Sequence, residues 1–190
     1  MLRNYEIPKL INDLLNFSRL SKAEDDFQTV DLNKLPDSVL SDFDLLITQR
    51  NAVIDVSALP ILVGSPVSLR QLFYNLISNA LKFGRQDVPP HIKIKSRKAT
   101  KKDIPDSMME GGNRKYQLIE ISDNGIGFEQ KYAEKIFEVF QRLNTRGAYS
   151  GSGIGLSIVK RIIENHNGHI SAASELDKGT TFTLLLPLPG

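Results

Sequence analysis

Two asparagines and a lysine in the segment Asn75-Leu-Ile-Ser-Asn79-Ala-Leu-Lys82 have the spacing of one helical stripe. Residues three or four apart share a face of an α-helix, so these three side chains point in the same direction. Carboxamide oxygens beside an ammonium group suit a magnesium and phosphate ligand, because Mg2+ keeps several waters and takes few protein ligands. An internal hydrogen-bonded amide pair, or ordinary surface residues, would give the same pattern. The segment by itself leaves these interpretations open.

A carboxylate and two glycines follow in Asp123-Asn-Gly125-Ile-Gly127, directly after an expected strand at residues 118–122. An aspartate at the buried end of a strand accepts hydrogen bonds, for example from an exocyclic amine. Glycines let the backbone turn and approach a planar ring closely. The motif therefore fits a site for an amino-substituted heterocycle, and it equally fits a plain turn at the end of a strand.

A glycine-rich segment, Gly151-Ser-Gly153-Ile-Gly155, lies at the start of a helix that we expect at residues 152–165. Successive backbone N–H groups at a helix N-terminus attract phosphate. Residues 142–150 before it are polar, contain glycine and lack apolar periodicity, which predicts a lid that orders on ligand binding. The chain lacks the third glycine of a dinucleotide fingerprint, the Gly-Lys-Ser/Thr of a phosphate loop, and the HRD and DFG triplets of protein kinases.

The elements that must position these motifs alternate between strands and helices. Ser65 and Pro66 mark the start of the helix that carries the asparagines, as a cap residue followed by proline at the first helical position. The predicted order is one α+β domain with a mixed sheet covered on one face by helices. Hydrophobic patterns predict strands at 27–32, 52–57, 61–63, 91–97, 116–122, 168–175 and 180–186, helices at 35–50, 66–83 and 152–165, short helices at 129–140 and a solvated loop at 98–115.

An additional helix is expected at the N-terminus. Its apolar residues approach i, i+3, i+4, i+7 spacing. It either covers the core of its own domain or forms half of a helical hairpin whose partner is missing. The apolar positions are Ile7, Leu10, Ile11, Leu14 and Phe17.

Composition excludes several classes of function. At 190 residues the chain is large enough for a packed core, and its net charge of +2 gives no indication of a nucleic-acid-binding surface. Zero cysteines exclude disulfides, thiol nucleophiles and cysteine-ligated zinc, and a total of only three histidines argues against a histidine-rich metal site. No signal peptide and no bilayer-length apolar run occur, so we expect a cytoplasmic segment without membrane contact, whose full-length parent is free to be membrane-anchored.

Taken in order, the motifs resemble those of the catalytic, ATP-binding domain of sensor histidine kinases, in the superfamily of gyrase, heat-shock chaperone, histidine kinase and mismatch-repair ATPases. The resemblance implies a Bergerat-type ATP-binding fold, a two-layer α/β sandwich preceded by one helix. Residues 1–25 would be part of the dimerisation and phosphoacceptor hairpin, and residues 26–190 the ATP-binding domain. The matching segments are an N box at 75–83, glycine boxes at 123–128 and 151–156, a phenylalanine box at 136–140 and a Gly-Thr segment at 179–182.

Residue by residue, the resemblance implies catalytic roles for Asn75, Lys82 and Arg142 and a magnesium ligand in Asn79. Asp123 would accept the hydrogen bond of the adenine amine. The residues implied to bind ATP are Asn75, Asn79, Lys82, Phe83, Asp123, Gly125, Gly127, Phe137, Phe140, Gly151, Gly153, Gly155, Leu156 and Thr180.

Asn75 separates reaction classes, because the hydrolytic and serine-phosphorylating relatives have a glutamate there as a base. An asparagine is no useful base near neutral pH, whereas a histidine acceptor brings its own nucleophilic nitrogen. The implied partners are ATP with Mg2+, a phosphoacceptor hairpin of the same or a partner protomer, and a response regulator receiver domain, with a homodimer in the full-length protein.

Two departures from the family pattern stand out. Gly84 replaces a common Thr or Ser, which predicts the loss of a polar contact, and no segment resembling His-Glu-Leu-Arg is present. We therefore expect that this chain alone does not phosphorylate itself. A regulatory nucleotide-binding module without kinase turnover, or a hydrolytic ATPase, are the competing interpretations.

Overall fold

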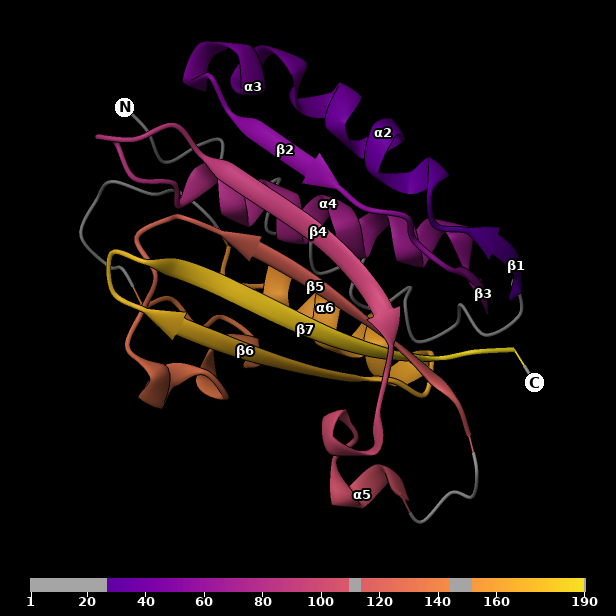
Figure 1. Ribbon diagram of the computed structural model, residues 1–190. Coiled ribbons are helices and arrows are strands. Elements are labelled where there is room, and N and C mark those ends of the chain that lie inside the picture. Colours follow the sequence, from indigo (N-terminus) through magenta and orange to yellow (C-terminus); the bar gives the residue numbers. More distant parts are fainter. Residues whose placement is uncertain (1–26, 110–113, 144–151, 190) are drawn as a thin grey trace.

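The computed structural model describes residues 27–109, 114–143 and 152–189. They form two layers, with a five-stranded sheet in the order β2-β4-β5-β7-β6 packed on helices (Figure 1). The β2–β4 pair is parallel and the other three pairs are antiparallel, so the sheet is mixed as predicted. The strands are β2 (Val53–Val56), β4 (His91–Lys98), β5 (Tyr116–Asp123), β7 (Gly179–Pro187) and β6 (His169–Glu175).

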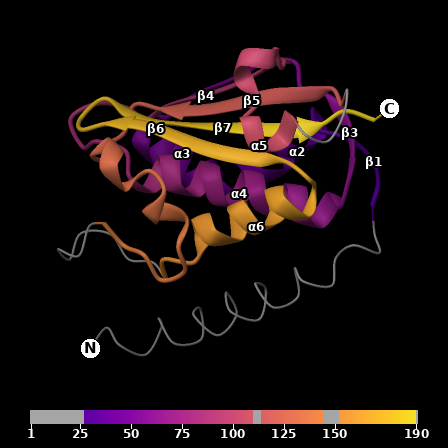
Figure 2. The ribbon, with the colours of Figure 1, turned by 90° about the horizontal axis from the view of Figure 1, so that it is seen from below.

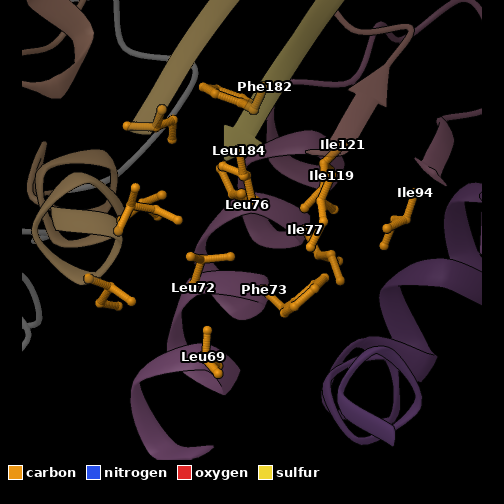
Figure 3. Close-up of a cluster of buried hydrophobic side chains, with 14 of the residues drawn as sticks. Leu69, Leu72, Phe73, Leu76, Ile77, Ile94, Ile119, Ile121, Phe182 and Leu184 are labelled. Atoms are coloured by element: carbon orange, nitrogen blue, oxygen red, sulfur yellow. The ribbon is translucent and has the colours of Figure 1, made fainter. Parts of the chain in front are cut away.

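Two long helices, α4 (Pro66–Lys82) and α6 (Gly155–Asn165), cover one face of this sheet (Figure 2). At the start of α4, the Ser65 hydroxyl accepts a hydrogen bond from the Ser68 N–H and Pro66 takes the first helical position, as predicted. The apolar stripe of α4 meets the inward-facing residues of the central strands (Figure 3). The residues of this contact include Leu69, Leu72, Phe73, Leu76 and Ile77 on α4 and Ile119, Ile121 and Leu184 on the sheet.

The prediction of a single sheet is wrong in one respect. Strands β1 (Gln28–Asp31) and β3 (Ile61–Gly64) form a separate two-stranded antiparallel sheet. The side-chain amide of Asn33 explains the separation, because it donates to Leu59 O and accepts from Leu59 N, each at 2.8 Å. These bonds take the backbone positions that a neighbouring strand would occupy, and the chain leaves the large sheet between β2 and β3.

The predicted helix at 35–50 is also wrong as one continuous element. It divides into α2 (Lys34–Leu40), the 3-10 turn η2 (Ser41–Phe43) and α3 (Asp44–Arg50). Serine and aspartate side chains near the break compete for backbone hydrogen bonds, as when Ser41 Oγ donates to Asp37 O at 3.0 Å.

The region predicted as a solvated loop, 98–115, contains the 3-10 turn η3 (Lys101–Asp103) and the short helix α5 (Asp106–Met109). Met108 and Ile104 there cover a small apolar cluster on the outer face of the sheet, which sequence periodicity did not indicate. The short helices predicted at 129–140 are the 3-10 turns η4 (Gln130–Tyr132) and η5 (Lys135–Phe137).

The N-terminal helix predicted within residues 1–25 and most of the predicted lid lie outside the described residues. The division into residues 1–25 and 26–190 therefore stays a prediction. Among the helices that the structure describes, none has the length and apolar character needed to span a membrane.

Candidate functional site

A cavity of about 420 Å³ lies on the helical side of the sheet, between α4, the end of β5 and the start of α6. Segments far apart in the sequence meet there, since the cavity is lined from all three polar motifs and from β7. The predicted site residues in its lining are Asn75, Asn79, Lys82, Phe83, Asp123, Gly127, Arg142, Gly153, Gly155, Leu156 and Thr180.

The α4 stripe forms one wall of this cavity. Asn75, Asn79 and Lys82 lie on it as the helical spacing predicted. The ammonium group of Lys82 lies 4.6 Å from the centroid of the Phe83 ring, a cation–π distance that keeps this charge beside the cavity. Arg142, from the segment after Phe137, also lines the cavity, and two cationic side chains suit a phosphate ligand.

The amide of Asn75 is incompletely paired. Gln71 Nε2 donates to Asn75 Oδ1 at 3.4 Å, while Asn75 Nδ2 is buried and has no partner among the described residues. A buried donor without an acceptor costs about 1–3 kcal/mol. Because Asn75 lines the cavity, an acceptor oxygen bound beside it would relieve that cost.

Asp123 lies at the opposite end, at the last position of β5. Its Oδ1 accepts the backbone N–H groups of Gly125 at 2.8 Å and Thr180 at 3.3 Å, whereas Oδ2 has no such partner in the described part of the chain. Burial raises the pKa of Asp123 to about 6, against the lowering effect of the two backbone hydrogen bonds. At neutral pH the group is therefore a carboxylate with an acceptor oxygen at the cavity.

Two glycines allow the loops around Asp123 to pack closely. Gly127 has φ +58°, and a Cβ on it would lie 2.0 Å from Glu175 O. Gly179 has φ +103°, and a Cβ on it would lie 1.9 Å from Asp123 O. Both positions require glycine for conformation and for space, so the turn after β5 and the turn before β7 are joined into one end wall.

The start of α6 forms the third wall. Gly153 has φ +72° and precedes an eleven-residue helix that begins at Gly155. The first N–H groups of a helix have no partner within it and carry partial positive charge, so this end of α6 favours an anion in the cavity. The expected helix start at residue 152 is three residues too early, and Gly151 lies outside the described residues.

A sequence model of the family described as "Histidine kinase-, DNA gyrase B-, and HSP90-like ATPase" matches residues 64–190, about two thirds of the chain. The chain belongs to this family. The histidine-kinase-type ATP-binding domain predicted from the motifs is thereby confirmed.

Curated relatives of this ATPase domain include phytochrome and phytochrome-like proteins. Cyanobacterial phytochrome A of Nostoc sp. (strain PCC 7120) is 36% identical over 181 residues, which cover 95% of this chain and 22% of the relative. Phytochrome-like protein Cph1 of Synechocystis sp. is 33% identical over 181 residues, with 94% and 22% covered. The chain thus spans about a fifth of the length of these relatives.

Solved structures share the fold of the ATPase domain. Full-length ShkA in complex with AMPPNP has a TM-score of 0.72 at 24% identity, over 97% of this chain and 36% of that one. The catalytic domain of histidine kinase ThkA has a TM-score of 0.66 at 23% identity, over 85% and 95%. The predicted α+β sandwich with a mixed sheet is confirmed.

Three predicted residues lie outside the cavity lining of the ATPase domain. Gly125 acts through Asp123, to which its N–H donates. Phe137 is buried and its ring lies edge-on to Phe182, with 6.3 Å between centroids, while Phe140 is 56% exposed with φ +65°. The part of both phenylalanines in nucleotide binding stays a prediction.

Sequence motifs missed several residues of the lining. Gln71, Tyr74 and Ser78 extend the Asn75 stripe of α4, and continuing the i, i+3, i+4 spacing would have found them. Other lining residues lie inside the matching segments, although no role was predicted for them: these are Ile126, Phe128, Ile136, Ser152 and Phe182. Gln141, Leu143 and Ile158 lie outside those segments and have no motif signal.

Proposed function

We propose that the domain binds ATP with Mg2+ and serves as the catalytic part of a sensor histidine kinase, which transfers the γ-phosphoryl group of ATP to a histidine. The nucleophilic histidine nitrogen forms the new bond to the γ-phosphorus, the bond to the β,γ-bridging oxygen breaks, and ADP leaves. The phosphoryl group then passes to an aspartate of a response regulator receiver domain.

The observation that carries this proposal is the distribution of acid groups in the cavity. Among the described residues of the lining, Asp123 provides the sole carboxylate, and its Oδ1 is held by two backbone N–H groups. The stripe of α4 at the other end offers the neutral amides Asn75 and Asn79. No lining carboxylate remains to activate water, which favours an acceptor that is already a nucleophile, such as histidine.

Different walls of the cavity would bind different parts of the nucleotide. Asp123 Oδ2 would accept the adenine amine, which orients the base. Lys82, Arg142 and the N–H groups at the start of α6 would stabilise charge on the phosphates, and positioning with charge stabilisation is most of what phosphoryl transfer requires. The Asn75 Nδ2 donor would satisfy its hydrogen bond on a phosphate oxygen or its water.

Mg2+ fits the same donor set. Among the described residues, no group of three or more His, Cys, Asp or Glu side chains could hold a metal ion. These residues therefore provide no metal site of the acidic type. Magnesium that keeps its waters and binds phosphate oxygens needs few protein ligands, and the carboxamide oxygen of Asn79, which lines the cavity, would be one. The ion would neutralise charge on the phosphates during transfer.

The remaining partners belong to the longer protein. Residues 1–25 would form part of the dimerisation and phosphoacceptor hairpin, the full-length kinase would be a homodimer, and the acceptor histidine would lie on the same or the partner protomer. All three histidines of the chain lie in this domain, and His166 is buried with both ring nitrogens hydrogen-bonded to backbone. The acceptor is therefore expected on a separate segment.

Label transfer tests the proposal. The chain is incubated with γ-labelled ATP, Mg2+ and a hairpin fragment that carries the acceptor histidine, and acid-labile, base-stable phosphate on the hairpin is expected. A hairpin with that histidine replaced by glutamine is the control. Tight nucleotide binding without label transfer would favour the regulatory module, and steady phosphate release by the chain alone would favour the hydrolytic ATPase.

A further inference from the structure

Arg50, the last residue of α3, lies against the C-terminal end of α4. Its Nη1 donates to Leu81 O at 2.9 Å, and its Nη2 donates to Gly84 O at 3.3 Å and to Arg85 O at 2.7 Å. The last carbonyls of a helix have no partner within it and carry partial negative charge, so the guanidinium group pairs one of them, Leu81 O, and complements the helix dipole. The other two acceptors belong to the residues that follow α4.

Gly84 provides the space for this contact. A Cβ on Gly84 would lie 3.2 Å from Arg50 Nη2 and 3.2 Å from Pro90 Cγ. Its φ lies outside the left-handed region, so glycine is not required there for conformation. A methyl group at this position would require the guanidinium group or the Pro90 ring to shift by a few tenths of an ångström. At Gly84, where the loss of a polar contact is expected, the backbone carbonyl accepts one hydrogen bond from Arg50.

The segment that Arg50 holds is also the outer support of the Asp123 loop. Phe83 O accepts the N–H of Ile126 at 2.9 Å, and both residues line the cavity. Arg85 Nη1 donates to Asp177 O at 3.0 Å, and the N–H of Asp177 donates to Ile126 O at 2.8 Å. Residues 81–85 are thus fixed by Arg50 on one side and by the loop after Asp123 on the other.

We propose that Arg50 is a positioning residue for the adenine end of the nucleotide site, with Gly84 as the neighbour that admits its guanidinium group. This inference rests on the proposed function. Arg50 acts through residues 81–85, which hold Ile126 and with it the loop that presents Asp123. At the phosphate end, Asn75, Asn79 and the start of α6 make no described hydrogen bond with Arg50, and only the backbone of Lys82 belongs to the segment that Arg50 holds.

The test compares ADP with GDP, because GDP has no 6-amino group for Asp123 and reports the phosphate end. Arg50→Met keeps the length of the side chain and removes its donors. It is expected to raise the Kd for ADP by about five- to twentyfold and to change the Kd for GDP less than about twofold. Competition against a fluorescent nucleotide measures both constants. Arg50→Lys keeps the charge, reaches fewer carbonyls, and should give an intermediate loss.

Two further variants make the test specific. Arg97→Met is the control, because Arg97 also donates through both Nη atoms, to the carboxylate of Asp103, and neither residue lines the cavity. This variant should leave the ratio of the Kd for ADP to the Kd for GDP unchanged. Gly84→Ala should reproduce the Arg50→Met loss, and the double variant should lose no more than either single variant, because both remove the same contact.

Two results would overturn the positioning role: an equal loss of affinity for ADP and GDP in Arg50→Met, or losses of ADP affinity that add up in the double variant. If Arg50→Met does not fold, the variants Arg50→Lys and Gly84→Ala provide the test, through the same ratio of the Kd for ADP to the Kd for GDP. A wild-type chain that binds neither nucleotide contradicts the proposed function itself, whereas wild-type binding with an unchanged ratio in every variant contradicts this inference alone.

Discussion

The backbone N–H of Thr180 donates to Oδ1 of Asp123 at 3.3 Å, which joins the start of β7 to the end of β5. The N–H of Gly125 occupies the same oxygen at 2.8 Å. With Oδ1 bound by two donors, the carboxylate is held in one orientation, and its other oxygen is available to a ligand in the cavity. The orientation of the carboxylate thus depends on the backbone of the turn after β5 and of strand β7.

Replacing Asp123 by alanine is expected to weaken adenine nucleotide binding by roughly ten- to a hundredfold, the loss of one charge-assisted hydrogen bond of about 1.5–3 kcal/mol. Calorimetric titration with ADP measures the effect. Binding of GDP serves as the control, since it should change far less. An unchanged Kd for ADP would remove Asp123 from the base site.

Nucleotide affinity should depend on pH through the same carboxyl. Burial raises the pKa of Asp123 to about 6 in the free domain, so below that pH the group is protonated and loses its role as an ionised acceptor. The Kd for ADP is expected to be constant above about pH 7 and to rise by up to about tenfold per pH unit below 6. Asp123→Asn should flatten this dependence, and a profile that persists in that variant would assign it to another group.

The raised pKa of Asp123 also affects the stability of the ligand-free fold, with a pH dependence opposite in sign to that of nucleotide affinity. A folded-state pKa of about 6 above the ordinary 3.8 means that the folded chain binds the proton more tightly than the unfolded chain. The contribution of Asp123 to stability is therefore fully present below pH 3.8 and is lost as pH rises through 6. Asp123 therefore weakens the empty fold at neutral pH, which is the cost expected if the same carboxylate serves in binding.

Sequence patterns located the two ends of the site because each end follows a local rule. Asn75, Asn79 and Lys82 line the cavity since α4 is a regular helix whose period fixes its faces. Asp123 was found because a carboxylate between a strand and a glycine turn has a local signature. No such rule covers Arg50, whose role arises only when α3 lies against the end of α4, 31 residues further along the chain.

The separate sheet of β1 and β3 escaped prediction for a similar reason. Its strands have ordinary alternating patterns. What sets this pair of strands apart from the five-stranded sheet is the Asn33 amide, which is bound to the backbone of Leu59, 26 residues away. Periodicity reports which face of a strand is buried and carries no information about which sheet the strand joins.

The metal role of Asn79 predicts a difference between two titrations. Asn79→Ala is expected to weaken ATP binding by roughly tenfold in the presence of Mg2+ and by much less in excess chelator, because the carboxamide acts on the ion and not on the base. A matched variant is Ser78→Ala, which also alters a cavity side chain of α4 and should leave the magnesium dependence intact. Equal losses of affinity with and without Mg2+ would exclude Asn79 as a ligand.

His166 should make the fold sensitive to mild acid. Its Nδ1 pairs with Ile162 O at 2.7 Å, so Nδ1 carries the proton, and Nε2 accepts the N–H of Ser65 at 3.1 Å, which ties the end of α6 to the start of α4. Burial lowers the pKa of His166 below its ordinary value of 6.5.

A histidine with a lowered folded-state pKa contributes stability that is present above pH 6.5 and is lost as pH falls toward the folded value, because the unfolded chain takes up the proton first. Protonation of Nε2 would also remove the acceptor that Ser65 requires. The free energy of unfolding should therefore fall on acidification below 6.5, with a slope of up to about 1.4 kcal/mol per pH unit from this group. Urea unfolding of wild type and His166→Gln across pH 5–8 measures the difference, and parallel stability curves for the two proteins would show that His166 does not titrate in this range.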